Sequence, residues 1–112
     1  MADINTKQAV LPTPVKQADG VDVKTLTIKQ WFSKINEELD ELKEVILRWG
    51  GLDYVGLRSG FVEASDKDAL ADEAADTITA ITSMLEAMGI DERQRQAAQM
   101  RVNEKNRRRG RF

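Results

Sequence analysis

The sequence predicts an all-α protein whose helical bundle is completed by homo-oligomerisation. Two long segments, residues 27–48 and 65–88, repeat apolar residues at the three- and four-residue spacing of an amphipathic helix. A third helical segment begins at Asp91 and carries few apolar residues. Because this third helix cannot cover the apolar stripes of the other two, we expect the uncovered surface to contact further copies of the chain. The expected assembly is a homodimer or a homotetramer.

The start of the chain differs from the rest in composition. Residues 1–24 contain both prolines and show no helical period. We expect them to form an extended or disordered N-terminal arm, or an arm that lies along a partner subunit. Residues 25–112 would then form a single helical domain, because a chain of 112 residues holds one domain at most.

The first predicted helix runs from about Thr27 to Arg48 and ends before Gly50 and Gly51. Glycine readily takes the left-handed conformation that stops a helix. At about 100° per residue, six apolar residues fall on one side and form the predicted stripe of this helix. They are Ile28, Phe32, Ile35, Leu39, Leu42 and Ile46.

A Gly-rich segment, residues 50–64, separates the two long helices. It is either a connector that packs its apolar residues on the bundle, or a lid or wall of a binding site. In the second case Tyr54 and Phe61 are the candidate ligand contacts.

The second predicted helix begins with Ser65 as its N-cap and acidic residues in its first turn. It continues to Met88 and stops at Gly89. Its predicted stripe consists of Leu70, Ala74, Ile78, Ile81, Leu85 and Met88.

The third predicted helix begins with Asp91-Glu92-Arg93-Gln94, which has the form of a capping box. It leads into a basic C-terminus, because six of the residues 101–112 are Lys or Arg. Such a cluster could clamp phosphates. It could equally bind nucleic acid without specificity, or complement the dipole of the helix.

Two pairs of carboxylates have the same placement on the two long helices. Glu38 and Glu41 are three residues apart on the first helix, and Glu73 and Asp76 are three apart on the second. Residues at this spacing are neighbours on a helix surface. In each pair the first acid lies at the edge of the apolar stripe and the second lies one step further out. One such pair alone would more often be a solvated face.

If the two helices pack side by side, four carboxylates surround one small space. Their repulsion would be relieved by a cation, and Mg²⁺ is the usual one because it prefers oxygen ligands. The paired acids therefore predict a metal site that handles phosphates.

The composition excludes several kinds of chemistry. The chain has no His and no Cys, which excludes Ser–His–Asp and Cys–His nucleophile systems and thiolate zinc sites. The net charge of −2 gives no overall attraction to nucleic acid or to a membrane. No stretch has the length of a membrane span, and the N-terminus lacks the pattern of a signal peptide. We therefore expect a cytoplasmic protein without a membrane partner, and nucleic acid is not the expected ligand.

Taken in order, these motifs resemble a known family. The chain carries Glu-Glu-x-x-Glu-Leu at 37–42, Glu-x-x-Asp at 73–76, and Lys-Asn-x-x-Arg-Gly-x-Phe at 105–112. This series resembles the MazG-like all-α nucleoside triphosphate pyrophosphohydrolases over residues 27–112. The resemblance implies hydrolysis of a nucleoside triphosphate to the monophosphate and pyrophosphate, which clears unwanted nucleotides. It also implies a helical homodimer or homotetramer with composite active sites.

The resemblance also implies roles for individual residues. In that family the paired acids hold Mg²⁺, for which Mn²⁺ is a substitute. The implied metal ligands are Glu38, Glu41, Glu73 and Asp76. Residues of the last helix contact the triphosphate, and those implied here are Lys105, Asn106 and Arg109.

Two predicted roles concern the surroundings of the first acid. Glu38 is the preferred general base, because partial burial beside Trp31 would raise the pKa of its carboxyl, although a nearby cation opposes this. Glu41 is the alternative base. Trp31 is a predicted substrate contact.

One feature departs from the family pattern, because the gap between the acidic motifs is longer than usual.

A different class of function stays open as the alternative. In it the chain is a helical interaction or nucleic-acid-binding module that uses its basic C-terminal tail.

Overall fold

The computed structural model describes residues 10–48 and 64–112. Within these residues the chain forms three α-helices: α2 (Ile28–Leu47), α3 (Ala64–Ala87) and α4 (Glu92–Arg108). A small hairpin of β1 (Gln17–Ala18) and β2 (Val21–Asp22) and a 3-10 turn, η1 (Val23–Thr25), precede them. The predicted helical character is thus confirmed, whereas completion of a bundle by further copies stays a prediction.

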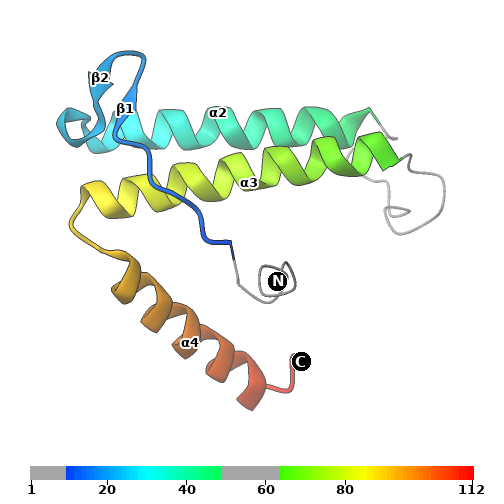
Figure 1. Ribbon diagram of the computed structural model, residues 1–112. Helices are drawn as coiled ribbons and strands as arrows, with labels where there is room; N and C mark the ends of the chain where they lie inside the picture. Colours follow the sequence, from blue (N-terminus) through cyan, green and yellow to red (C-terminus); the bar gives the residue numbers. More distant parts are fainter. Residues whose placement is uncertain (1–9, 49–63) are drawn as a thin grey trace, which may run out of the picture.

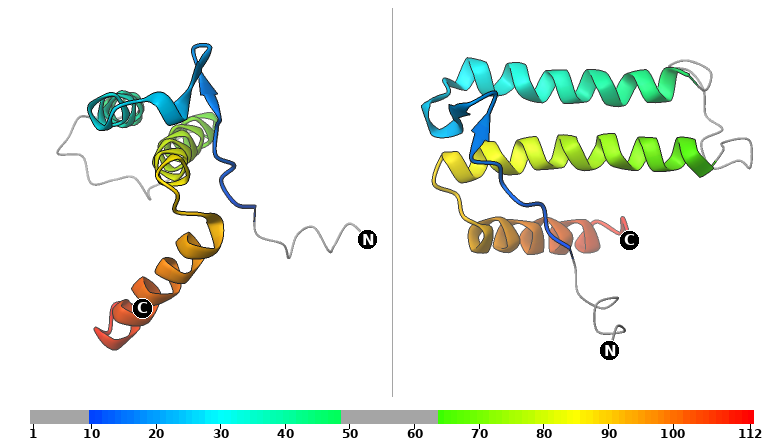
Figure 2. Two further views of the ribbon diagram at one scale, coloured as in Figure 1. Left: turned by 90° about the vertical axis from the view of Figure 1, so that its left-hand side faces the viewer. Right: turned by 45° about the horizontal axis from the view of Figure 1, so that its top comes forward.

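The long helices α2 and α3 lie side by side and run in opposite directions (Figure 1). Helix α4 follows a short turn and diverges from this pair towards the C-terminus, as Figure 1 and the left view of Figure 2 show. The described part of the chain is therefore a helical hairpin with a third helix that leaves it. None of the helices in this part combines the length and hydropathy of a membrane span.

The start of α2 is fixed by a capping box. The backbone N–H of Gln30 donates to Thr27 Oγ1 at 3.1 Å, and the N–H of Thr27 donates to Gln30 Oε1 at 2.8 Å. Two amides that would otherwise lack a partner are satisfied in this way. The predicted start near Thr27 is confirmed. The proposed stop at Gly50 and the segment 50–63, with Tyr54 and Phe61, lie outside the described residues.

The turn from α3 to α4 forms as the sequence predicts. Gly89 has a φ of 88°, and the N–H of Ile90 donates to the carbonyl of Leu85 at 2.9 Å. The N–H of Gly89 reaches the carbonyl of Glu86 at 3.0 Å, which completes a Schellman motif. Asp91 and Gln94 then form the predicted capping box of α4.

The predicted N-cap of α3 was wrong. Helix α3 already includes Ala64, so Ser65 lies inside the helix and is not its N-cap. Such an error is common, because helix ends depend on local hydrogen bonds that shift by a residue or two.

The core between α2 and α3 is shifted to one side of the predicted stripe of α2: it keeps Ile35 but adds Trp31 and Val45 and leaves Phe32 exposed. Trp31 is only 4% exposed, and Ile35 and Val45 are also buried, whereas Phe32 is 54% exposed. On α3 the buried positions are hydroxyl residues, Thr77 and Ser83 among them. Part of each predicted stripe stays exposed, namely Ile28, Phe32, Leu39, Ile78, Ile81 and Met88.

The arm before α2 contains a hairpin that the sequence analysis missed. Asp19 and Gly20 both have positive φ, 53° and 79°, which is the backbone of a two-residue turn between antiparallel strands. Asp-Gly is a strong hairpin signal, but the flanking strands are too short to show alternation. After the hairpin, Val23 is buried. The described part of the arm is therefore held against the helices of its own chain.

Candidate metal centre

The structure brings together acids from both long helices. Glu38 of α2 and Glu73 and Asp76 of α3 each place a carboxylate oxygen within 4.8 Å of the other two. Glu73 and Asp76 come from one turn of α3, as their spacing of three predicts. Glu38 meets them because α2 and α3 pack side by side. We call these three residues the acid cluster.

Two oxygens of the acid cluster lack the partners that buried polar atoms normally have. Glu38 Oε2 and Glu73 Oε2 are out of contact with solvent and have no hydrogen-bond partner among the described residues. A buried carboxylate oxygen without a partner is costly, and a cation or a proton removes the cost. The cluster is therefore suited to bind a positive ligand.

The electrostatics of the cluster agree with this view. Burial raises the pKa of Glu38 above its usual value, and the negative charges of Glu41, Asp76, Glu73 and Glu37 raise it further. Burial likewise raises the pKa of Glu73, followed by the charge of Glu41 and a hydrogen bond to the Glu41 side chain. Glu41, the fourth predicted acid, is therefore near enough to raise the pKa of both carboxyls, but it is not one of the three acids whose oxygens lie within 4.8 Å of one another.

The dimensions of the cluster suit a hard divalent cation. Oxygens on opposite sides of Mg²⁺ are about 4.1 Å apart, since each bond is about 2.0–2.1 Å long. Neighbouring oxygens around Mg²⁺ are closer, about 2.9 Å apart at these bond lengths, so carboxylates within 4.8 Å of one another would have to move together to bind the ion. The longer bonds of Ca²⁺, about 2.3–2.6 Å, would require less closure. The donor set thus fits Mg²⁺, but binding alone does not distinguish the two ions.

A cavity of about 210 Å³ adjoins the cluster and shares Glu38 and Asp76 with it. Trp31, the predicted substrate contact, lies in its wall together with Lys34. The sequence analysis missed Lys34. Its position four residues before Glu38 on α2, and hence on the same helix face, is the signal that could have identified it.

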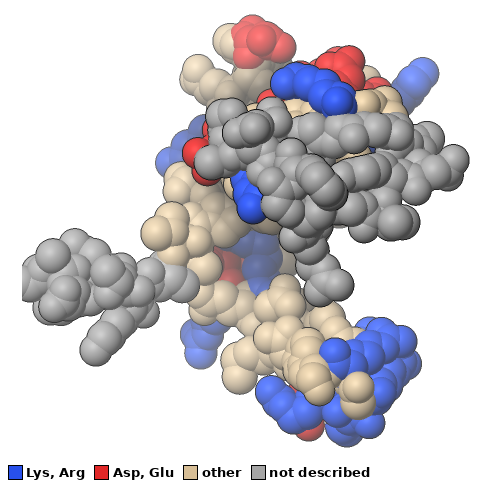
Figure 3. All heavy atoms as spheres, turned by 90° about the vertical axis from the view of Figure 1, so that its right-hand side faces the viewer, with Lys and Arg blue, Asp and Glu red and all other residues tan. Residues whose placement is uncertain are grey.

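The predicted phosphate contacts lie elsewhere in the chain. Lys105, Asn106 and Arg109 are at the end of α4, where Arg109 is the C-cap. None of them lines the cavity beside the cluster. Figure 3 shows Lys and Arg side chains gathered at this free end of α4. The structure of one chain therefore brings together three of the four predicted acids, with Trp31 in the wall of the adjoining cavity, but it does not place the three C-terminal residues at that cavity.

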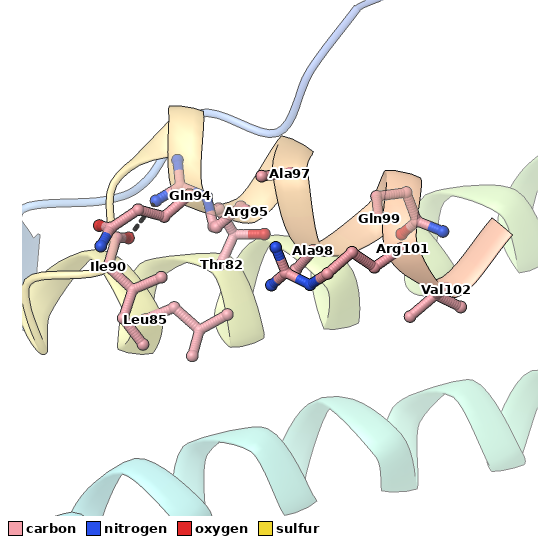
Figure 4. A pocket seen from close by; sticks show the side chains of 10 residues that line it. All are labelled: Thr82, Leu85, Ile90, Gln94, Arg95, Ala97, Ala98, Gln99, Arg101 and Val102. Atoms are coloured by element: carbon pink, nitrogen blue, oxygen red, sulfur yellow. Dashed lines mark hydrogen bonds between the residues drawn. The ribbon is translucent and has the colours of Figure 1, made fainter. Parts of the chain in front are cut away.

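A second, larger hollow of about 760 Å³ lies between the end of α3 and α4 (Figure 4). Leu85, Ala98 and Val102 contribute apolar surface to it, and Arg101 extends along it. Arg95 fixes the turn beside it by donating to Glu86 Oε1 at 2.8 Å and to the Ile90 carbonyl at 2.6 Å. This hollow contains no member of the acid cluster.

Comparison with known proteins adds no family assignment. Protein-family models give no match to the sequence, and neither the curated proteins nor the solved structures give one. A function must therefore be inferred from the residues of this chain, chiefly the acid cluster and its surroundings.

Proposed function

We propose that this chain is a Mg²⁺-dependent nucleoside triphosphate pyrophosphohydrolase of the MazG-like all-α type. It would convert a ribo- or deoxyribonucleoside triphosphate and water to the monophosphate and pyrophosphate, and so remove unwanted nucleotides from the pool. The observation that carries the proposal is the meeting of Glu38, Glu73 and Asp76 within 4.8 Å, with two desolvated carboxylate oxygens. The motifs that resemble the family supply these same residues.

The four acids would divide the work at the reacting phosphate. Glu38, Glu41, Glu73 and Asp76 would hold the cation, and Mn²⁺ could substitute for Mg²⁺. When bound, the ion supplies charge neutralisation for the phosphates and lowers the pKa of water. Water forms a bond to phosphorus while the bond to the pyrophosphate leaving group breaks in line with it. A carboxylate oxygen of Glu38 accepts the proton of that water, and Glu41 is the alternative acceptor.

The phosphate contacts would come from a second copy of the chain. Every residue of α4 keeps some exposure, and none is buried within the described residues. The apolar side chains Phe32, Ile78 and Met88 are also more than half exposed on the helical pair. Packing of a second copy on this surface would form a homodimer or homotetramer. It would also allow Lys105, Asn106 and Arg109 of one copy to reach the acids of another.

Release of pyrophosphate from a panel of triphosphates tests the proposal directly. Activity is expected with Mg²⁺ or Mn²⁺ and is expected to vanish with a chelator. Ca²⁺ serves as a control ion, because it also prefers oxygen ligands but has longer bonds and looser geometry. Glu38→Gln, Glu41→Gln, Glu73→Gln and Asp76→Asn should each lower the rate by orders of magnitude.

Asp40→Asn is the matched control for these variants, since Asp40 is an exposed acid on α2 outside the cluster. It should keep normal activity. Full turnover in the chelator, or near-normal rates in two of the four cluster variants, would contradict the proposed site.

The basic end of α4 supports one alternative function. Arg107, Arg108 and Arg109 are exposed, and such a group of charges binds nucleic acid backbones without sequence preference. Under this alternative the chain is a helical interaction or nucleic-acid-binding module. Its affinity for nucleic acid would fall steeply with salt concentration, whereas a hydrolase would require divalent metal at any moderate salt concentration.

A further inference from the structure

The N-terminal arm crosses α3 and reaches α4. Traced back from the hairpin towards the N-terminus, its described residues pass over α3 and end near α4, as Figures 1 and 2 show. A cavity of about 290 Å³ lies where the three segments meet. The residues that line it include Leu11 and Pro12 of the arm, Ile78 and Thr82 of α3, and Arg95 and Gln99 of α4. The arm therefore joins two helices that otherwise diverge.

The arm keeps this course for two reasons. The backbone N–H of Val15 donates to Ser83 Oγ at 2.9 Å, and the Ser83 hydroxyl, which is 0% exposed, donates to the carbonyl of Thr79 at 2.7 Å. Pro12 and Pro14 also restrict their own φ and favour an extended conformation in the residue before each of them. Such a segment loses less conformational entropy when it is laid along a surface. The sequence thus favours an extended arm, and Ser83 fixes where it crosses α3.

Helix α4 depends on few contacts of its own. None of its residues is buried within the described part of the chain. Arg95, whose side chain is 14% exposed, ties the first turns of α4 to Glu86 and to the carbonyl of Ile90. Within residues 10–48 and 64–112, no hydrogen bond joins the later turns of α4 to another element. A helix that is tied at one end can pivot there, so contacts beside Arg95 and Gln99 limit its angle.

We infer that residues 10–16, which we call the strap, set the angle of α4, and that Leu11 and Pro12 are positioning residues for the phosphate contacts at its end. The inference rests on the proposed function, which places Lys105, Asn106 and Arg109 at the triphosphate. The 17 residues of α4 span about 25 Å. A rotation of about 10° at its first turn would therefore move its end by about 4 Å. That displacement exceeds what a hydrogen bond tolerates.

The rate of thiol labelling tests whether the strap closes over α3 and α4. The chain has no cysteine, so Thr82→Cys introduces a single thiol at a position that is 9% exposed and lines the cavity at the strap. Its labelling rate reports how often the surrounding segments open. Leu11→Asn should raise this rate by about three- to tenfold, as expected for the loss of a partly buried Leu contact. Val10→Asn is the matched control, because Val10 is 96% exposed, and it should leave the rate unchanged.

Distances between spin labels test whether the strap sets the angle of α4. The labels are attached to Lys29→Cys on α2 and Arg108→Cys on α4, and the labelled protein is diluted with unlabelled protein so that only distances within one chain are measured. The parent should give one narrow distribution. Leu11→Asn combined with Ser83→Ala, which weakens the strap at two points, should replace it by a broad one. A second pair, Lys29→Cys with Ala71→Cys, should stay unchanged, since it lies within the pair of α2 and α3.

Steady-state hydrolysis tests the positioning role itself. In the Leu11→Asn/Ser83→Ala variant KM for a triphosphate should rise by about three- to tenfold, because apparent affinity falls with the fraction of molecules in which α4 is in place. The value of kcat should not change, since substrate binds the correctly placed form. Partial unfolding would instead lower kcat. A broadened distance distribution with an unchanged KM would overturn the positioning role.

The outcomes separate this inference from the proposed function. If the distance distribution broadens and labelling accelerates as expected but no triphosphate is hydrolysed, the strap stands as the element that sets the angle of α4 and the pyrophosphohydrolase fails. If triphosphates are hydrolysed while the strap variants keep the labelling rate and the distances of the parent, the strap is overturned and the hydrolase stands. An equal acceleration by Val10→Asn would also overturn it.

Discussion

Replacement of Glu38 by Gln should stabilise the metal-free protein, and the effect should depend on pH. Burial and neighbouring acids raise the pKa of Glu38 above its ordinary value of 4.5. Between 4.5 and the raised pKa the folded state binds more protons than the unfolded state. Stability of the parent protein therefore falls as pH rises through this window, and the penalty is fully present above it. The variant has no such penalty from this position.

The separations in the cluster set the size of the effect. Two unit charges 4.8 Å apart repel by about 0.9 kcal/mol at the dielectric constant of water and by about 3.5 kcal/mol at an effective value of 20. Glu38 is only half-buried, so the lower figure applies. We expect Glu38→Gln to raise the free energy of unfolding by about 1 kcal/mol at neutral pH. For a chain of this size that is about 4 °C in Tm.

The difference in stability between the parent and the variant is measured by thermal unfolding in chelator. Both proteins are compared at one protein concentration and over a range of pH. The difference should be near zero well below pH 4.5 and should reach its plateau at neutral pH. Asp40→Asn removes the same charge from the same helix outside the cluster, and it should not stabilise. Addition of Mg²⁺ should stabilise the parent more than the variant, because the variant has lost a ligand. Destabilisation by Glu38→Gln, a difference independent of pH, or equal stabilisation by Asp40→Asn would refute the reasoning.

Three further outcomes are expected. Arg109→Ala should lower kcat/KM for a triphosphate by about 10–100-fold, which corresponds to about 1.5–3 kcal/mol for a hydrogen bond to a charged group. Unaltered kinetics after truncation of the chain behind Val102 would contradict this role. Ser83→Ala should lower the free energy of unfolding by about 1–3 kcal/mol, because the Val15 amide loses its acceptor. The arm of this variant should also be cleaved faster by a protease. Unchanged proteolysis would contradict the idea that Ser83 holds the arm. Light scattering at micromolar concentration should give at least twice the chain mass of 12.6 kDa, because exposed apolar side chains such as Phe32 and Ile78 need cover. A fully active monomer would contradict both this packing and a composite active site.

The features that sequence reasoning anticipated are local ones. The start of α2 near Thr27, the capping box at Asp91 and the stop at Gly89 each depend on hydrogen bonds between residues no more than five positions apart. The pairing of Glu73 with Asp76 follows from helix geometry alone. Residue types and spacing suffice for such features, because the chain itself brings the partners together.

The hairpin and Lys34 escaped prediction for a different reason. Strands of two residues show no alternation, so Asp19-Gly20 lacked the flanking pattern that makes it a hairpin signal. In the sequence, nothing distinguishes Lys34 from a solvated surface lysine. Its relevance depends on a cavity whose walls come from three separate segments.

By itself, the sequence determined the helical character, most helix ends and the acids that could hold a cation. Only the tertiary structure decided which strip of α2 meets α3, with Trp31 buried and Phe32 exposed. The apolar surface of α2 is wide enough for either strip, so the helical period alone does not select between them. The same packing decided that Glu38 meets Asp76 and that the arm walls a cavity beside them. Contacts between residues distant in sequence arise from side-chain packing, which periodicity does not encode.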